Sequence, residues 1–422
     1  MAVRPHVVVI GAGFGGIATV RALRDAPVDV TLVDRDNYHL FQPLLYQVAT
    51  SVLDPSQIAY PIRAILRRCP NAAFRLAAVT GIDLDGRRVL TDRGDIGYDQ
   101  VVIAAGSVTN YFGIAGLDRR SFALKNLGQA LLLRTRILEH FERAAAEPDA
   151  EERRRLLTFA IVGGGPTGVE FAGALSELIH LVLRKDFPEL DVAQVLIVLA
   201  DTQDHVLSPF ARSLRRVAQD ALQAKGVTLR LGVMVSDVDR AGLQLAGGGR
   251  LDAATVVWMG GVRAAPLAAE LAVEHGAQGR IRVDPLTLRL PNRDDAYAIG
   301  DIAELGDGAA ALPMLAPVAI QGGQHVAAWI TAGLRGDTIP SFRYRDKGTM
   351  ATIGRNSAVA QVGRLRLSGF IGWLAWLFVH LILLVGFRSR IVVLVNWAWD
   401  YFFRDRPVRL ITVPDPKQPG EG

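Results

Sequence analysis

The chain has 422 residues, half of them hydrophobic, and a formal net charge of +5. This length allows two or three folded domains, and the composition excludes a disordered protein. The sequence contains no basic tract interleaved with aromatics, so nucleic-acid binding is not indicated. The mild excess of positive charge would instead favour contact with an anionic membrane surface.

The number of cysteines excludes several kinds of site. Cys69 is the single cysteine, so one chain cannot build a disulfide framework, a redox-active cysteine pair or a thiolate metal cluster. No metal site is predicted. The N-terminus enters an apolar strand directly, without a signal-like segment, which predicts a chain that is not exported.

The first 34 residues follow the order strand, glycine turn, helix, strand, acid. Residues 7–10 are apolar and β-branched, and a glycine-rich turn, 11–16, follows them. Gly11 allows the tight turn, Gly13 lets the backbone approach a pyrophosphate, and Gly16 lets the helix pack on the strand. Asp34 closes the second strand, where a ribose hydroxyl would need an acceptor. The pattern predicts a dinucleotide-binding unit.

Three further segments fit the first unit. Residues 37–53 are rich in aromatics and amides and read as a loop leading into a short helix. Residues 99–106 form a buried strand that ends in Ala105 and Gly106, whose small size allows close approach of a cofactor. Residues 295–301 form a strand that runs into Gly300 and Asp301.

The opening pattern returns in the middle of the chain. A strand at 158–162, a second glycine-rich turn at 163–168 and a helix at 169–178 indicate a second dinucleotide site. The acid expected at the end of the next strand is missing, because the aligned residue is Leu199; Asp201, two positions on, is a possible substitute. Discrimination between NADH and NADPH is left open by this departure.

The sequence resembles the type II NADH dehydrogenases, which are single-subunit NADH:quinone oxidoreductases of the pyridine nucleotide-disulfide reductase superfamily. The resemblance runs almost end to end, including the hydrophobic tail. Besides the two glycine turns, it rests on 41–49 (FQPLLYQVA), 298–301 (AIGD), 316–321 (APVAIQ) and 347–354 (KGTMATIG). Pro317 stands where the family has the first glutamine of its quinone motif.

The motifs and this resemblance together give the predicted site residues. Non-covalent FAD is expected at Gly11, Gly13, Phe14, Gly15, Gly16, Asp34, Arg35, Gln42, Pro43, Ala105, Gly106, Gly300 and Asp301. NADH is expected at Gly163, Gly165, Pro166, Thr167, Gly168, Glu170, Asp201 and Gly260. Quinone is expected at Leu44, Gln47, Gln321 and Lys347. The resemblance implies catalytic roles for Glu170, Gln321 and Lys347.

The tail predicts membrane association. Residues 370–387 carry no formal charge over 18 positions, which meets the usual length of a spanning candidate. Asn396, Asp400 and Arg404 then form one polar stripe on an apolar helix. Trp373, Trp376, Trp397, Trp399 and Tyr401 suit a membrane interface. One spanning helix with an interfacial helix is possible; the family favours a monotopic arrangement.

The predicted fold is α/β, with two Rossmann-like dinucleotide-binding domains and a C-terminal membrane-anchoring helical segment. Residues 1–125 and 280–345 form the FAD domain, 126–279 the NADH domain and 346–422 the membrane-associated region. The predicted activity is transfer of hydride from NADH to FAD and of two electrons to a membrane quinone, ubiquinone or menaquinone, without proton pumping. The location is the cytoplasmic face of the cell membrane, with a possible homodimer. A reductase of a soluble acceptor and a non-catalytic flavoprotein sensor are the alternatives.

Overall fold

A computed structural model describes residues 4–306, 311–406 and 408–411. The chain divides into two compact units. The first contains the described residues within Met1–Leu40, Ala59–Val108 and Val262–Lys347, and the second those within Phe41–Ile58, Thr109–Gly261 and Gly348–Gly422. Both units are α/β, as the two glycine-turn motifs predict.

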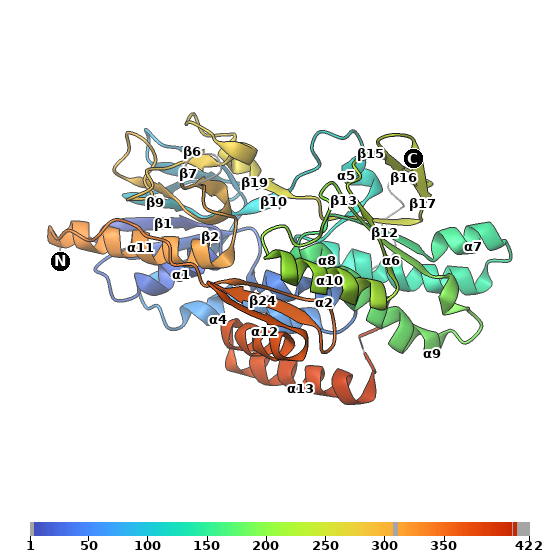
Figure 1. Ribbon diagram of the computed structural model, residues 1–422. Coiled ribbons are helices and arrows are strands. Elements are labelled where there is room, and N and C mark those ends of the chain that lie inside the picture. Colours follow the sequence, from blue (N-terminus) through green and yellow to red (C-terminus); the bar gives the residue numbers. More distant parts are fainter. Residues whose placement is uncertain (1–3, 307–310, 407, 412–422) are drawn as a thin grey trace. The chain divides into compact units, whose positions relative to one another are not determined.

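The first unit is built on a parallel sheet of five strands in the order β21-β9-β1-β2-β5 (Figure 1). The strands are β1 (His6–Ile10), β2 (Asp29–Asp34), β5 (Ala72–Leu76), β9 (Gln100–Ile103) and β21 (Ala296–Ala298). Val7, Val8 and Val9 are fully buried, because helices cover the faces of a parallel sheet and its central strand meets no water.

Two helices of the first unit pack closely on each other. They are α1 (Phe14–Ala22) and α11 (Ala316–Arg335). A Cβ built on Gly323 of α11 would lie 2.5 Å from the carbonyl oxygen of Gly15, so the backbones approach closely only because glycine occupies this position. Smaller elements complete the unit: β3 (Tyr38–Leu40), β4 (Ala59–Pro61), α4 (Ile62–Leu66), β6 (Val79–Asp83), β7 (Arg88–Thr91), β8 (Ile96–Gly97), β19 (Val262–Ala264), β20 (Ile281–Arg282) and β22 (Ala303–Glu304).

The second unit repeats the arrangement with a parallel sheet in the order β11-β18-β12-β13-β14. The strands are β11 (Phe122–Ala123), β12 (Thr158–Val162), β13 (Leu196–Asp201), β14 (Val227–Leu231) and β18 (Thr255–Trp258). The helices are α5 (Leu117–Arg120), α6 (Leu127–Ala146), α7 (Ala150–Leu156), α8 (Pro166–Glu177), α9 (Arg184–Asp186) and α10 (Arg212–Ala224). An antiparallel sheet of β15 (Val235–Asp239), β16 (Gly242–Leu245) and β17 (Gly249–Asp252) is added.

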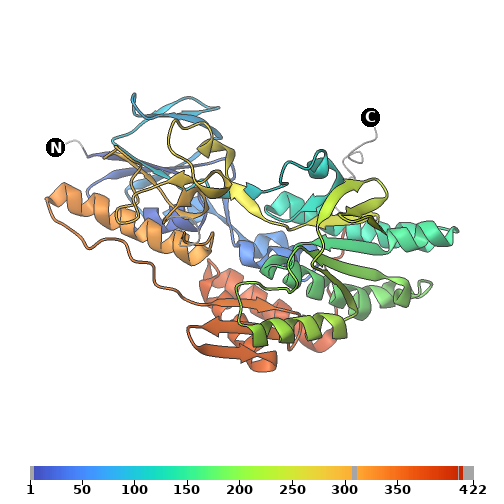
Figure 2. The same cartoon turned by 45° about the horizontal axis from the view of Figure 1, so that its top comes forward.

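The C-terminal part of the chain joins the second unit. It forms an antiparallel sheet of β23 (Thr349–Thr352), β24 (Ala358–Val362) and β25 (Leu365–Ser368), followed by helices α12 (Gly369–Leu383) and α13 (Phe387–Phe403). The sheet packs against α8 and α10 and also against α12, and α13 follows as the last helix (Figures 1 and 2). Helices α2 (Leu45–Ala49) and α3 (Pro55–Ile58) also belong to this unit; α2 contacts α6 and α8, and α3 contacts α13.

These packing relations place the unit boundaries differently from the predicted domains. Segment 41–58, which sequence places in the FAD domain, packs in the second unit together with 109–125, whereas 262–279 pack in the first. The C-terminal sheet and helices are not a separate compact body. Which nucleotide each unit binds stays a prediction.

Residues 370–387 do not form one continuous helix. Helix α12 ends at Leu383, Leu384 is extended and Gly386 has a φ of 91° before α13 begins. Fifteen residues of helix reach about 22 Å, short of a hydrocarbon core of about 30 Å. Among the residues that the structure describes, no helix combines the length and the apolar character needed to cross a bilayer.

Substitution of Gly173 tests the packing of α8 on the C-terminal sheet. A Cβ there would lie 2.5 Å from the backbone oxygen of Ile353. We therefore expect Gly173→Ala to lower the free energy of unfolding by about 1–3 kcal/mol through overpacking. Gly333→Ala is the matched control, because it lies in α11 with nothing within 4 Å of the added Cβ; it should raise stability by roughly 0.5–1 kcal/mol. Equal effects of the two changes in chemical denaturation would contradict this packing.

Candidate functional site: two dinucleotide cradles and a buried glutamate

The glycine turn of the first unit has the geometry of a phosphate cradle. Gly11 has a φ of 98°, and a Cβ on Gly16 would lie 1.8 Å from the oxygen of Gly11. Gly13 is the N-cap of α1, makes no side-chain cap and has nothing within 4 Å of a built Cβ. The N-terminus of α1, with its positive dipole end, therefore has the geometry that favours an anion beside Gly13.

The acid at the end of β2 faces this turn. Asp34 accepts hydrogen bonds from the backbone N–H of Ala12 at 2.6 Å and of Asp36 at 2.9 Å. Burial raises the pKa of its carboxyl group. The imidazole of His39 contacts the oxygen of Ala12 at 2.8 Å and meets the ring of Phe14 edge-on. The turn, the acid and the helix N-terminus thus form one rigid site.

The remaining predicted FAD residues are divided between the units. Ala105, Gly106, Gly300 and Asp301 lie in the first unit, where the Ser107 hydroxyl donates to Asp301 at 2.5 Å. Gly106, with a φ of 71°, again has nothing within 4 Å of a built Cβ. Arg35 is exposed and pairs with Asp36 at 3.9 Å. Gln42 and Pro43 belong to the second unit, where the Gln42 amide donates to the oxygen of Lys125 at 2.7 Å.

The second unit contains the same cradle. Gly163 has a φ of 115°, and a Cβ on Gly168 would lie 1.9 Å from the oxygen of Gly163. Gly165 is an N-cap without a side-chain cap, with open space beside it, and Pro166 begins α8. Thr167 follows in the first turn of α8, and Gly260 lies just after β18. All predicted NADH residues therefore lie in this unit.

The prediction that Leu199 occupies the position of the missing acid is wrong. Gly11 donates to the oxygen of Val33, the residue before Asp34, and Gly163 donates in the same way to Ala200, the residue before Asp201. Asp201 accepts from the backbone N–H of Gly164 and, at 2.7 Å, from that of Gln203, which are the contacts that Asp34 makes in the first unit. Asp201 is thus the equivalent acid, and the strand that carries it ends two residues later than the sequence pattern indicated.

Glu170 lies on the buried side of α8. Its side chain accepts a hydrogen bond from the backbone N–H of Thr352 at 3.3 Å. The indole N–H of Trp376 faces the carboxyl group and partly lowers its pKa, although no acceptor lies in hydrogen-bond geometry with that nitrogen among the described residues. Burial outweighs both donors and raises the pKa of Glu170 to about 8. The carboxyl group therefore holds a proton at neutral pH.

The quinone candidates also divide between the units. Leu44 and Gln47 are buried in the second unit, and Gln321 and Lys347 lie in the first, where Lys347 is exposed. Both amide atoms of Gln321 pair with the backbone of Arg345, at 2.9 and 3.0 Å. This reciprocal pair gives Gln321 a role in fixing the backbone two residues before Lys347.

Sequence reasoning missed the inward-facing part of the tail. Trp376 was expected at a membrane interface but is 1% exposed, and it stacks on His380 with ring centroids 4.1 Å apart. Burial lowers the pKa of His380 to about 4. Trp397 hydrogen-bonds to Gln47 at 2.8 Å. The i, i+4 spacing of Trp376 and His380 could have shown that they share a face, but not that this face is turned inward.

The fold and these sites define a class of protein with two dinucleotide-binding units in one chain. The family model for pyridine nucleotide-disulphide oxidoreductases matches residues 5–323, and that for the NDH2 C-terminal domain matches residues 347–405. The chain is 40% identical over 424 residues to the type II NADH:quinone oxidoreductase Ndh of Mycobacterium tuberculosis, covering 97% of this chain and 90% of that protein.

Two further comparisons extend this finding. The probable NADH dehydrogenase of Dictyostelium discoideum is 32% identical over 408 residues, covering 94% of this chain and 89% of that protein. The structure of NDH2 from Plasmodium falciparum shares the fold, with a TM-score of 0.88 at 20% identity, covering 96% of this chain and all of that one. The chain belongs to the pyridine nucleotide-disulphide oxidoreductase family and, within it, to the type II NADH:quinone oxidoreductases.

The raised pKa of Glu170 predicts a pH-dependent stability. The folded chain holds a proton that the unfolded chain releases above about 4.5, the ordinary pKa of a glutamate. The free energy of unfolding therefore falls as the pH rises from about 4.5 to about 8, by at most about 1.4 kcal/mol per pH unit. Glu170→Gln should flatten this slope in chemical denaturation between pH 5 and pH 8.

The control for this measurement is Glu189→Gln, at an exposed position of the same unit. It should leave the pH dependence unchanged. An identical slope in the unchanged protein and in Glu170→Gln would contradict a raised pKa at this carboxyl group.

Proposed function

We propose that the chain is a non-proton-pumping NADH:quinone oxidoreductase that uses non-covalent FAD, bound in the first unit, and NADH, bound in the second. The observation that carries the proposal is the presence of two equivalent cradles, each with an uncapped helix N-terminus and an acid that faces the glycine turn. When bound, FAD supplies hydride acceptance from the nicotinamide and electron donation to the quinone. The chain's own residues would bind and orient FAD and the nicotinamide nucleotide and shield them from solvent.

In the first unit, the N-terminus of α1 would receive the pyrophosphate of FAD, and Asp34 would accept from a ribose hydroxyl. Asp301, oriented by Ser107, would accept from the ribityl chain. The open space beside Gly13 and Gly106 is compatible with a cofactor that passes close to the backbone.

In the second unit, α8 would receive the pyrophosphate of the nicotinamide nucleotide. Asp201 supports NADH over NADPH, because its carboxylate accepts from a free 2′-hydroxyl and repels a 2′-phosphate. Glu170, which is protonated at neutral pH, is a proton source five residues from the N-cap of the same helix. Because Cys69 is the single cysteine, the chain has no thiol pair of its own that could carry electrons to the acceptor.

The activity is tested anaerobically. Purified yellow protein is mixed with NADH or NADPH while flavin absorbance is followed, and a short-chain quinone is then added. NADH should bleach the flavin at least tenfold faster than NADPH, quinone should restore the colour, and Asp201→Ala should narrow the difference between the nucleotides. Bleaching without recovery would point to a soluble acceptor, and no bleaching by either nucleotide would point to a non-catalytic flavoprotein.

We also propose that the second unit binds a membrane surface through α12 and α13, without crossing it. Large apolar side chains are exposed along both helices, among them Phe378 at 65% and Phe402 at 74%. Asp400, by contrast, is turned inward and paired with arginines. A helix pair with its apolar face outward and its polar groups inward suits the interfacial region of a bilayer. The cytoplasmic face and a homodimer stay predictions.

Phe378→Asp combined with Phe402→Asp tests this surface. Each change places a charge where an apolar side chain would enter the lipid, so co-sedimentation with liposomes containing anionic lipid should fall at least fivefold, while reduction of the flavin by NADH is retained. Met234→Asp is the control, since Met234 is 57% exposed elsewhere in the unit. Equal liposome binding by the double variant and this control would refute the assignment.

A further inference from the structure

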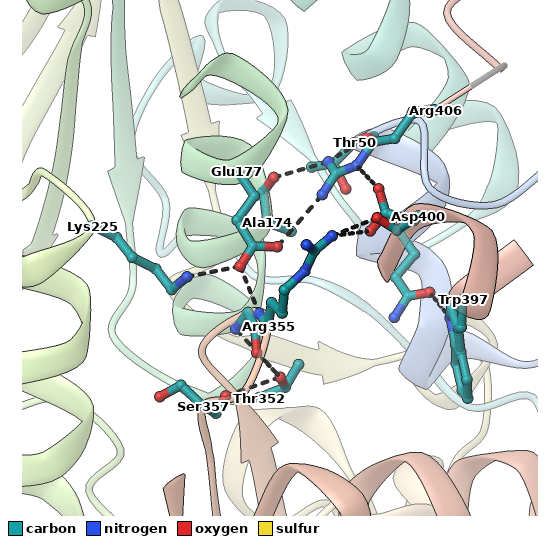
Figure 3. A network of polar contacts seen from close by, with 12 residues as sticks. Thr50, Ala174, Glu177, Lys225, Thr352, Arg355, Ser357, Trp397, Asp400 and Arg406 are labelled. Carbon is teal, nitrogen blue, oxygen red and sulfur yellow. Dashed lines mark hydrogen bonds and ion pairs between the residues drawn. The ribbon is translucent and has the colours of Figure 1, made fainter. Parts of the chain in front are cut away.

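Two successive hydrogen bonds connect Trp397 of α13, through Gln47, to Tyr46 of α2. Its indole N–H donates to the side-chain oxygen of Gln47 at 2.8 Å (Figure 3). The side-chain nitrogen of Gln47 in turn donates to the hydroxyl oxygen of Tyr46 at 2.9 Å. Because an indole nitrogen can only donate, it fixes which end of the Gln47 amide points toward Tyr46. The tyrosine hydroxyl accepts in this arrangement, so its own hydrogen is directed elsewhere.

Tyr46 and Glu170 share one buried environment. Tyr46 is 4% exposed and Glu170 is 8% exposed, and the helices that carry them, α2 and α8, are in contact. The ring of Tyr46 meets Trp376 edge-on at 6.5 Å, and the Trp376 indole faces Glu170. Burial, and secondly the charge of Glu170, raise the pKa of Tyr46 well above its ordinary value of 10. The tyrosine hydroxyl is therefore a neutral donor within electrostatic reach of the glutamate.

A set of ion pairs and hydrogen bonds holds α13 in place against α2 and α8. Asp400, three residues after Trp397, pairs with Arg355 at 3.6 Å and with Arg406 at 3.3 Å (Figure 3). Arg406 is 2% exposed and reaches Glu177, at the end of α8, at 3.5 Å.

The same arginine also contacts the backbone of both neighbouring elements. It donates to the oxygen of Thr50 at 3.0 Å, directly after α2, and to that of Ala174 in α8 at 3.2 Å. Removing a member of such a buried set leaves an uncompensated charge. This set therefore fixes α13 to the two elements that carry Gln47 and Glu170.

We propose that Trp397 is a positioning residue for quinone reduction: acting through Gln47, it orients the Tyr46 hydroxyl beside Glu170, and the ion pairs of Asp400 and Arg406 keep α13 in place. The inference rests on the proposed function and deepens it, because it links the helix with the exposed apolar face to the proton-bearing side of the site. Trp397 need not touch the quinone for this role.

Trp397→Phe tests the proposal, because it removes the indole N–H and keeps an aromatic ring. We expect kcat for quinone reduction to fall about tenfold, the loss that follows when one buried acceptor is left unpaired, with KM for the quinone changed less than twofold. Stopped-flow reduction of the flavin by NADH should stay within twofold of the unchanged protein. Trp329→Phe, which removes an indole N–H from α11 in the first unit, should leave all these values unchanged.

A double-mutant cycle separates action through Gln47 from a general structural effect. In a Gln47→Leu background, adding Trp397→Phe should cause no further loss of kcat. If Trp397→Phe lowers the flavin content, Gln47→Leu alone must show the same fall in kcat with unchanged reduction by NADH. Multiplicative losses, a change in KM alone, or unchanged kcat would overturn the proposal. Failure of the unchanged protein to reduce quinone would instead overturn the proposed function.

Discussion

One steric constraint, met twice, organises this chain. In each unit a helix begins against the turn that precedes it, so closely that a single methyl group on Gly16 or Gly168 would lie within 2 Å of a carbonyl oxygen. This approach aims the open helix N-terminus at the space above the strand, and it brings the second residue of the turn onto the acid that ends the neighbouring strand. One packing contact therefore sets the positions proposed to bind the phosphates and the ribose.

The second unit adds a constraint that the first lacks. Three segments far apart in the sequence, 41–58, 166–177 and 348–406, converge in it. Glu170 comes from the middle segment, Tyr46 and Gln47 from the first, and Trp376 and Trp397 from the last. The pKa of Glu170 is raised because its carboxyl group is buried. The C-terminal part of the chain contributes to this environment, because the backbone N–H of Thr352 donates to the carboxyl group and the indole of Trp376 faces it.

The sequence predicted those features that local patterns encode. Buried apolar runs before glycine turns located the central strands, because a central parallel strand is apolar on both faces and a tight turn needs glycine. The same logic failed by two residues at the end of β13. The end of a strand is decided by its pairing with a neighbour, and β13 continues past Leu199 to Asp201 through its register with β14. The apolar run 370–387 likewise did not predict where its helix ends. The break at Leu384–Gly386 depends on backbone angles that an apolar composition does not reveal.

The inward-facing contacts of α12 and α13 could not be predicted from a local sequence pattern. A polar stripe on an apolar helix is compatible with polar groups in water and apolar groups inside, or with the reverse, and periodicity is the same in both cases. The inward position of Asp400 depends on two arginines outside α13: Arg406, just after the helix, and Arg355, 45 residues before Asp400. Once Asp400 is held inward, the opposite face of α13 must carry its apolar side chains outward, where only a lipid or protein surface can cover them. The ion pairs that anchor the helix therefore also determine which of its faces is exposed, and this exposed face is the one proposed to bind the membrane.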